Sequence, residues 1–154
     1  MEIIPAIIGK DFNEVSERMH RVGDFVRWVQ IDVMDGFFTQ NESWPFLMRG
    51  GEMELAGKLG SRHGGPHIEM HLMVKHPENY LEKLIEAGVD RVLVYYESTD
   101  EITIAEIFDE LNMAEVEAGI VLKLETPIDV LDEFMDKIDV VQLMSIAEIG
   151  AYGI

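Results

Sequence analysis

The sequence predicts an α/β protein built from successive strand–helix units around a parallel sheet. Short runs rich in β-branched residues alternate with longer segments of helical periodicity, which is the pattern of βα units. Strands are expected at residues 3–8, 28–34, 67–74, 91–96, 119–124 and 140–146. Helices are expected at residues 12–23, 45–59, 77–87, 102–117 and 128–138. Such units form either a doubly wound open sheet or a β/α barrel, and the pattern alone does not choose between them.

Residues with known capping preferences mark the boundaries of the expected helices. Residues that favour helix starts stand at or near the first position of several helices, namely Asp11, Ser43, Pro77 and Pro127. Gly23 and Gly88 favour helix ends and follow two of them. No Pro/Ser-rich linker or low-complexity run divides the chain, so residues 1–154 are expected to form a single domain.

Two further features favour the barrel. No Gly-x-Gly-x-x-Gly motif follows the first expected strand, where a dinucleotide-binding sheet would carry it. Polar residues instead gather at the C-terminal ends of several expected strands. Barrel enzymes place their chemistry at that end of the sheet.

Length and composition limit the class of protein. A chain of 154 residues with 47% hydrophobic residues allows one substantial core. The absence of cysteine excludes disulfides, zinc–thiolate sites and thiol nucleophiles, and it fits a reducing compartment. No N-terminal leader pattern is visible, and no segment reaches the roughly 18 apolar residues of a membrane span. A cytoplasmic protein without a membrane partner is therefore expected.

The formal net charge is −18, from 30 acidic residues against 12 lysines and arginines. Such a charge repels a nucleic-acid backbone as well as an anionic membrane surface, so neither is expected as a partner. An anionic sugar phosphate would need local backbone N–H groups to bind, because the overall field opposes it.

Two expected strands carry polar side chains on the face that should point away from the helices. Period-two alternation places on this face Gln30, Asp32 and Met34 from residues 28–34, and His67, Glu69, His71 and Met73 from residues 67–74. An inward, unpaired carboxylate is costly, so an inward Asp usually has a metal, a hydrogen-bond network or a catalytic duty. A satisfied polar core residue is the competing interpretation of each position alone. The joint arrangement on two strands favours a functional site.

A series of motifs resembles those of the ribulose-phosphate 3-epimerase family, in family order and over essentially the whole chain. They are Ile4-Pro5-Ala6-Ile7-Ile8 with Asp11-Phe12, Asp32-Val33-Met34-Asp35-Gly36, His71-Leu72-Met73-Val74, Gly119-Ile120-Val121-Leu122 with Thr126-Pro127, and Leu143-Met144-Ser145. The resemblance implies the family's (β/α) barrel of eight strands. With about six strands, this chain is expected to form an incomplete TIM-type barrel of the ribulose-phosphate-binding type.

The resemblance also implies the family's chemistry, which inverts C3 of a ketopentose 5-phosphate by removing and returning a proton. In the family, two carboxylates act as acid and base, and a divalent metal held by two His and two Asp stabilises the enediolate. Asp32 matches the first acid/base group, which is also a metal ligand, and His71 matches another metal ligand. The implied cofactor is zinc, iron or manganese.

Further positions match the family's substrate contacts. Met34, Met73 and Met144 match methionines that surround the reacting carbon. Gly150 and Gly153 loosely match the start of the glycine-rich loop that contacts phosphate. The implied partner is a sugar phosphate.

Several departures from the family pattern bear on activity. Ala6 replaces a substrate-contacting Ser, and Gln30 replaces the first metal-binding His, although a neutral amide is a poorer ligand than imidazole for zinc-like ions. The sequence ends at Ile154, before the seventh-strand Asp-Gly segment that supplies the second carboxylate. Because such groups act as a unit, we expect this chain alone to have little or no epimerase activity.

Two other interpretations stay open for the sequence. A non-catalytic barrel fragment, persisting as an oligomer or a sugar-phosphate binder, would account for Gln30 and Ala6. A related decarboxylase or aldol-type synthase would also place an Asp on the second strand. Those enzymes normally have a Lys close by, and residues 28–34 and 67–74 contain none.

Six strands do not match the closure of an eight-stranded barrel, so the first and last strands should have open edges. Residues 3–8 and 140–154 are therefore expected to contribute to a homodimer or a higher oligomer. A sheet that curls into a smaller, monomeric barrel is the alternative outcome.

Overall fold

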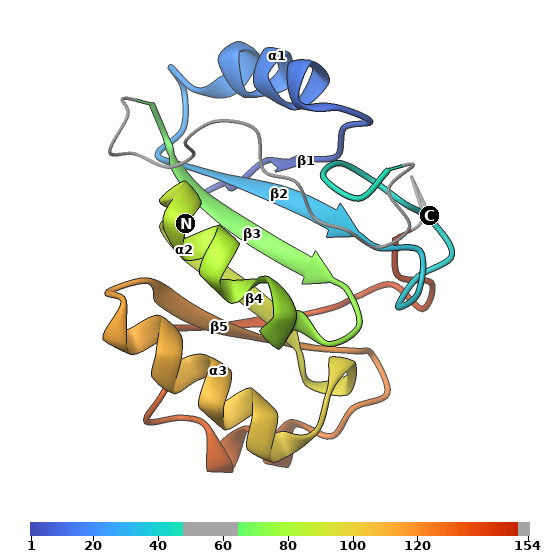
Figure 1. Ribbon diagram of the computed structural model, residues 1–154, viewed down its shortest axis with the longest axis vertical. Coiled ribbons are helices and arrows are strands. Elements are labelled where there is room, and N and C mark those ends of the chain that lie inside the picture. The colour runs from blue at the N-terminus through green and yellow to red at the C-terminus, as the bar shows by residue number, and fades with distance from the viewer. Residues whose placement is uncertain (48–64, 151–154) are drawn as a thin grey trace.

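The computed structural model describes residues 1–47 and 65–150. Its centre is a parallel sheet of six strands in the order β1-β2-β3-β4-β5-β6 (Figure 1). The strands are β1 Ala6–Ile7, β2 Trp28–Met34, β3 His67–Met73, β4 Arg91–Tyr95, β5 Glu117–Leu122 and β6 Val140–Leu143. Each strand pairs with the next one along the chain, without the reversal of strand order that defines a doubly wound sheet. The fold is therefore an incomplete (β/α) barrel, as the sequence predicts.

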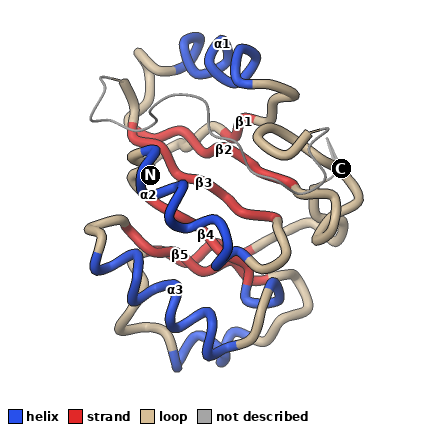
Figure 2. The backbone as a smooth tube through the Cα atoms, viewed as in Figure 1, coloured by secondary structure: helices blue, strands red, loops and turns tan. Residues whose placement is uncertain are grey.

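Helices cover one face of this sheet. They are α1 Phe12–Val22, α2 Leu81–Ala87 and α3 Glu101–Met113, with the 3₁₀ helices η2 Pro77–Tyr80, η3 Tyr96–Ser98 and η4 Ile128–Glu133. Figure 2 shows α2 and α3 lying along the same side of the strands. The other face corresponds to the interior of a barrel. No described helix has the length and apolar character needed to span a membrane.

Alternation along the strands creates two separate apolar clusters. The larger cluster lies between the sheet and the helices and includes Val33, Leu72, Val94 and Phe108. The smaller cluster lies on the interior face, where its buried members are Met34, Met73, Leu93, Tyr95 and Val121. Alternate side chains along each strand therefore have different locations. One set packs against the helices, and the other set lies on the face that corresponds to the barrel interior.

Local interactions explain where the helices begin and end. Asp11 caps α1 by accepting a hydrogen bond from the backbone N–H of Glu14, and Asp100 caps α3 through the N–H of Thr103. The hydrogen bonds from the Thr103 backbone N–H and hydroxyl lower the pKa of the Asp100 carboxyl. Helix α2 ends at Gly88, whose φ of 80° is favourable for glycine.

The observed elements differ from the expected ones mainly at their ends. Strand β2 has the predicted bounds, whereas β1 is confined to Ala6–Ile7 instead of residues 3–8. The expected helix at 128–138 is instead the 3₁₀ helix η4, in a segment rich in aspartate, which is a poor helix former. Residues 48–59 of the expected second helix lie outside the described part of the chain.

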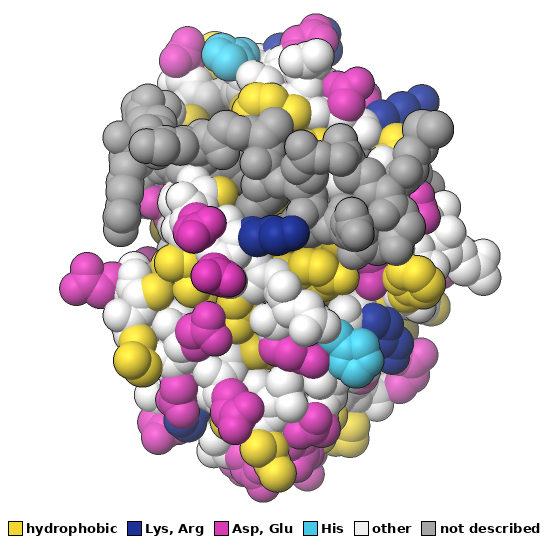
Figure 3. Space-filling model, in the orientation of Figure 1, with side chains coloured by type: hydrophobic (Ala, Val, Ile, Leu, Met, Phe, Trp, Pro, Cys, Tyr) yellow, Lys and Arg dark blue, Asp and Glu magenta, His cyan; other side chains and the backbone are white. Residues whose placement is uncertain are grey.

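The two outermost described strands leave edges and apolar side chains accessible. Within residues 1–47 and 65–150, β1 pairs with β2 alone and β6 pairs with β5 alone. Leu143 on the helix side of β6 is 60% exposed. Elsewhere, acidic groups outnumber basic ones over the face in Figure 3. Self-association through the strand edges stays a proposal.

Candidate functional site

The pairing of β2 with β3 brings Asp32 and His71 side by side on the interior face. The two residues are direct partners in the parallel register. The Nδ1 atom of His71 lies 2.8 Å from Oδ1 of Asp32, and the His71 side chain is 2% exposed. Gln30 Nε2 donates to the same Asp32 oxygen at 2.7 Å. The structure thus joins the predicted acid/base residue, the predicted metal-binding histidine and the glutamine that departs from the family pattern.

The hydrogen-bond geometry indicates where the protons lie. A carboxylate only accepts hydrogen bonds, so His71 with a proton on Nδ1 donates to Asp32, alongside the Gln30 amide. In neutral His71 this tautomer leaves Nε2 without a proton. The Nε2 atom is buried and has no hydrogen-bond partner among the described residues. An orphaned polar atom next to a carboxylate is the kind of feature that a ligand or a water satisfies.

Tyr95 lies against His71 at the end of β4. Their rings are stacked with centroids 5.2 Å apart. The Tyr95 side chain is completely buried, and its hydroxyl has no hydrogen-bond partner among the described groups. Burial and the nearby Asp32 charge raise the pKa of Tyr95 far above its usual value, so the phenol is neutral at physiological pH.

The methionines selected from the sequence gather around this polar group. Met34 and Met73 are buried in the interior cluster, and Met144 packs against it. Gly150 has a φ of +77°, and a Cβ at this position would lie 2.9 Å from the Met34 sulfur. The backbone therefore approaches the methionine at a distance that only glycine permits. Gly153 lies outside the described residues.

The loop after β2 is held in place by Asp35. This side chain is 1% exposed, and its Oδ1 accepts from the backbone N–H groups of Phe37 and Phe38. Its Oδ2 accepts from the backbone N–H of Lys75, which follows β3. The carboxylate thereby joins two loops at the C-terminal edge of the sheet. Asp35 lies within the motif Asp32-Val33-Met34-Asp35-Gly36, but its role in joining these loops was not predicted.

A pocket of about 460 Å³ opens at the same edge. Loops after β2, β5 and β6 line it, with Phe38, Asn41, Lys123, Glu148 and Ile149 among the contributors. Asn41 also donates to the Gly150 carbonyl at 2.9 Å, which connects the first loop to the last. Phe38 and Lys123 were not among the predicted site residues. The only available signal was position: Phe38 follows the expected strand at 28–34, and Lys123 lies near the C-terminal end of the one expected at 119–124.

The described residues do not fit a four-ligand metal site. They contain no group of three or more His, Cys, Asp or Glu side chains arranged to hold an ion. Asp32 and His71 supply two ligand types, and the third neighbour is the neutral amide of Gln30. Catalytic zinc sites normally use three protein ligands.

Replacing Gln30 by histidine should raise the affinity for Zn²⁺ by about tenfold or more, because imidazole would add a third ligand beside Asp32 and His71. Calorimetric titration at neutral pH measures this change. Gln40→His is the matched control, since Gln40 is exposed in the loop after β2. Equal affinities for the two variants would mean that Asp32 and His71 are not arranged to share an ion.

Comparison with known proteins agrees with this geometry. The profile described as "Ribulose-phosphate 3 epimerase family" matches residues 2–150. The ribulose-phosphate 3-epimerase of Chlamydia muridarum is 30% identical over 145 residues, which cover 94% of this chain and 59% of that protein. The ribulose-phosphate 3-epimerases of Synechocystis sp. and Schizosaccharomyces pombe are each 28% identical to this chain. The matched regions cover 94% of this chain, and 60% and 61% of those two proteins respectively.

The chain therefore spans about 60% of the length of these curated relatives. Membership of the family implies use of a divalent metal among its members. The family match extends over all six described strands and over the motifs that contain Asp32 and His71. The chain belongs to the ribulose-phosphate 3-epimerase family.

Proposed function

We propose that this chain binds a ketopentose phosphate at the C-terminal edge of its sheet and supplies, through Asp32, one of the two proton-transfer groups of an epimerase site. The observation that carries this proposal is the hydrogen-bonded group of Gln30, Asp32 and His71 on the interior face. Two donors directed at one carboxylate oxygen fix the orientation of the Asp32 side chain.

The positions of the other carboxylates support a site with a proton-transfer group on only one face of the substrate. The described strands carry three carboxylates: Asp32, Glu69 and Glu117. Glu69 and Glu117 both bind Arg91 at the opposite end of the sheet. Within the described strands, Asp32 therefore has no second carboxylate that could serve the other face of a substrate.

A single base predicts a specific reaction. Asp32 takes the proton from C3 of the ketose, and the C–H electron pair forms the C2–C3 double bond while the carbonyl oxygen becomes negative. The same carboxyl group then returns a proton to the same face of C3. In deuterium oxide this cycle exchanges the C3 hydrogen and retains the configuration, whereas epimerisation requires a proton from the other face.

Ribulose 5-phosphate in deuterium oxide should therefore lose its C3 proton signal slowly, with little epimer formed, when it is followed by proton NMR. Asp32→Asn should abolish the exchange, because the amide cannot accept the proton. Asp136→Asn is the matched control, since Asp136 is exposed on the segment after η4. Rapid epimer formation would show that the site is complete, and absence of exchange above the Asp32→Asn level would refute proton transfer by Asp32.

A non-catalytic sugar-phosphate-binding relative is the second candidate. It is favoured by Gln30 and Ala6, which stand where the family's metal ligand and substrate-contacting hydroxyl are expected. In this case the open edges of β1 and β6 would hold a homodimer or a higher oligomer together. Saturable binding of ribulose 5-phosphate without any C3 exchange would select this candidate.

A further inference from the structure

Two lysines meet over one aromatic ring at the C-terminal edge of the sheet. The Lys123 ammonium lies 4.4 Å from the centroid of the Phe38 ring, and the Lys75 ammonium lies 5.6 Å from it. Lys123 follows β5, Lys75 follows β3, and Phe38 belongs to the loop after β2. Segments far apart in the sequence thus converge on one point above the barrel interior.

This convergence is unusual in so acidic a protein. The formal net charge is −18, and acidic groups are abundant elsewhere on the surface. Lys137, which lies away from this edge, forms an ion pair with Asp109. Neither Lys75 nor Lys123 forms an ion pair with a carboxylate in the described part of the chain. Two ammonium groups beside one ring repel each other, and contact with the ring offsets only about 0.5–1 kcal/mol for each at an exposed site.

Three described acidic groups bear on the charge at this point: Glu97, Asp35 and Glu148. The Oε1 atom of Glu97 accepts from the backbone N–H of Lys123 at 3.1 Å and from the Thr126 hydroxyl, whereas its Oε2 atom is buried without a hydrogen-bond partner among the described residues. Asp35 is occupied by three backbone N–H groups. Glu148 lines the same pocket as Lys123, and its negative charge opposes an anion there. The backbone of Lys123 is therefore fixed by Glu97, while its ammonium group is available on the pocket side.

We propose that Lys123, assisted by Lys75, forms an anion site that takes the phosphate group of the sugar-phosphate substrate. The pocket beside Lys123 has a volume of about 460 Å³ and is also lined by Thr39, Gln40 and Asn41. A local ammonium overcomes the unfavourable overall field, and lysine binds phosphate as a point charge. The assignment to substrate rests on the proposed function, whereas the anion site itself does not.

Inorganic phosphate is the probe, titrated into the whole chain at constant ionic strength and followed by NMR chemical shifts. Lys123→Gln should weaken phosphate binding by about tenfold or more, and Lys75→Gln should weaken it by a smaller factor. Lys137→Gln makes the same change in net charge away from the pocket and should bind phosphate as the unmodified chain does. Thermal unfolding of each variant checks that the fold is retained.

Equal phosphate affinity in the Lys123→Gln and Lys137→Gln variants would overturn the inference, as would the absence of saturable phosphate binding by the unmodified chain. The Asp32→Asn variant separates this inference from the proposed function. It should bind phosphate normally while losing C3 exchange. If Lys123 binds phosphate and no C3 exchange occurs in the unmodified chain, the anion site stands and the catalytic proposal fails.

Discussion

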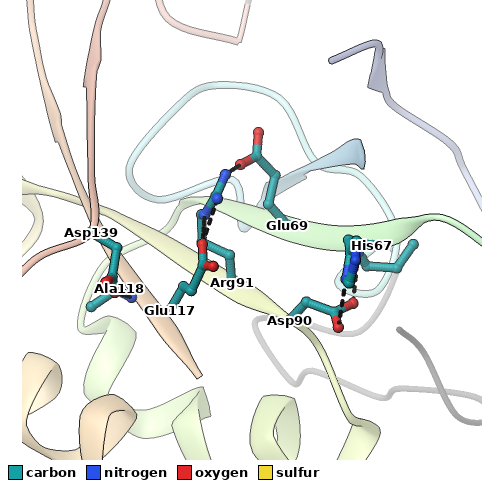
Figure 4. Close-up of polar contacts among 8 residues, drawn as sticks. His67, Glu69, Asp90, Arg91, Glu117, Ala118 and Asp139 are labelled. Carbon is teal, nitrogen blue, oxygen red and sulfur yellow. Dashed lines mark hydrogen bonds and ion pairs between the residues drawn. The ribbon is translucent and has the colours of Figure 1, made fainter. Parts of the chain in front are cut away.

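Replacing Arg91 by methionine should lower the free energy of unfolding by about 3–5 kcal/mol, because it leaves a buried carboxylate without its partner. Glu69 is 3% exposed and binds the Arg91 guanidinium at 2.7 Å. The same guanidinium binds Glu117 at 2.5 Å and stacks 3.9 Å from the Trp28 ring. Figure 4 shows Arg91 between the two glutamates at the start of β4. Urea unfolding monitored by circular dichroism measures the loss.

Two companion variants identify the cause. Glu117→Gln removes the other carboxylate, whose side chain is 44% exposed, and should cost about 1 kcal/mol or less. Combining Glu69→Gln with Arg91→Met removes both buried charges and should recover part of the loss. A cost below about 1 kcal/mol for Arg91→Met alone would show that Glu69 finds water or another partner.

The ion pairs of Arg91 could not be predicted from the sequence, because they depend on strand register. Glu69, Arg91 and Glu117 face one another only when β3, β4 and β5 pair in the observed alignment. Glu69 and Arg91 by themselves are polar groups near the starts of expected strands, and Glu117 was expected to end the helix at 102–117. Their position at the N-terminal end of the sheet suits stability, whereas the opposite end suits chemistry.

The alternation within β2 and β3 was a much stronger signal. Seven residues with a strict period of two give β2 its predicted bounds, Trp28–Met34, and place Asp32 and His71 on one face. The hydrogen bond between them required the structure, since a shared face does not specify a distance. Their roles as base and ligand stay predictions.

Features formed by loops were the hardest to predict. The pocket beside Lys123 combines segments after β2, β5 and β6, and no local pattern indicates that these segments meet. The short 3₁₀ helix η4 was mistaken for an α-helix because three apolar residues, Val130, Leu131 and Phe134, recur at helical spacing. The low helix propensity of its aspartates and the shortness of the segment favour the 3₁₀ helix that is observed at residues 128–133.

Replacing Tyr95 by phenylalanine should raise the free energy of unfolding at neutral pH by about 1–2 kcal/mol. The Tyr95 hydroxyl is buried and has no described hydrogen-bond partner, and leaving such a group unsatisfied costs about 1–3 kcal/mol. Phenylalanine keeps the stacking on His71 and the contact with Phe38. Tyr96→Phe is the matched control, because its hydroxyl donates to Glu101 and its loss should be neutral or destabilising.

The same substitution should change stability at alkaline pH. Burial and Asp32 raise the pKa of Tyr95 in the folded chain, whereas an unfolded tyrosine ionises near pH 10, by the value of about 10 for model peptides. The unfolded state therefore loses this proton first, and stability falls as pH rises above that value. Tyr95→Phe should remove this share of the fall, measured as urea midpoints from pH 8 to about pH 11. Tyr96→Phe should remove its own share, because the hydrogen bond to Glu101 raises the pKa of Tyr96 to about 12. If Tyr95→Phe instead lowers stability at neutral pH, the Tyr95 hydroxyl has a hydrogen-bond partner in solution.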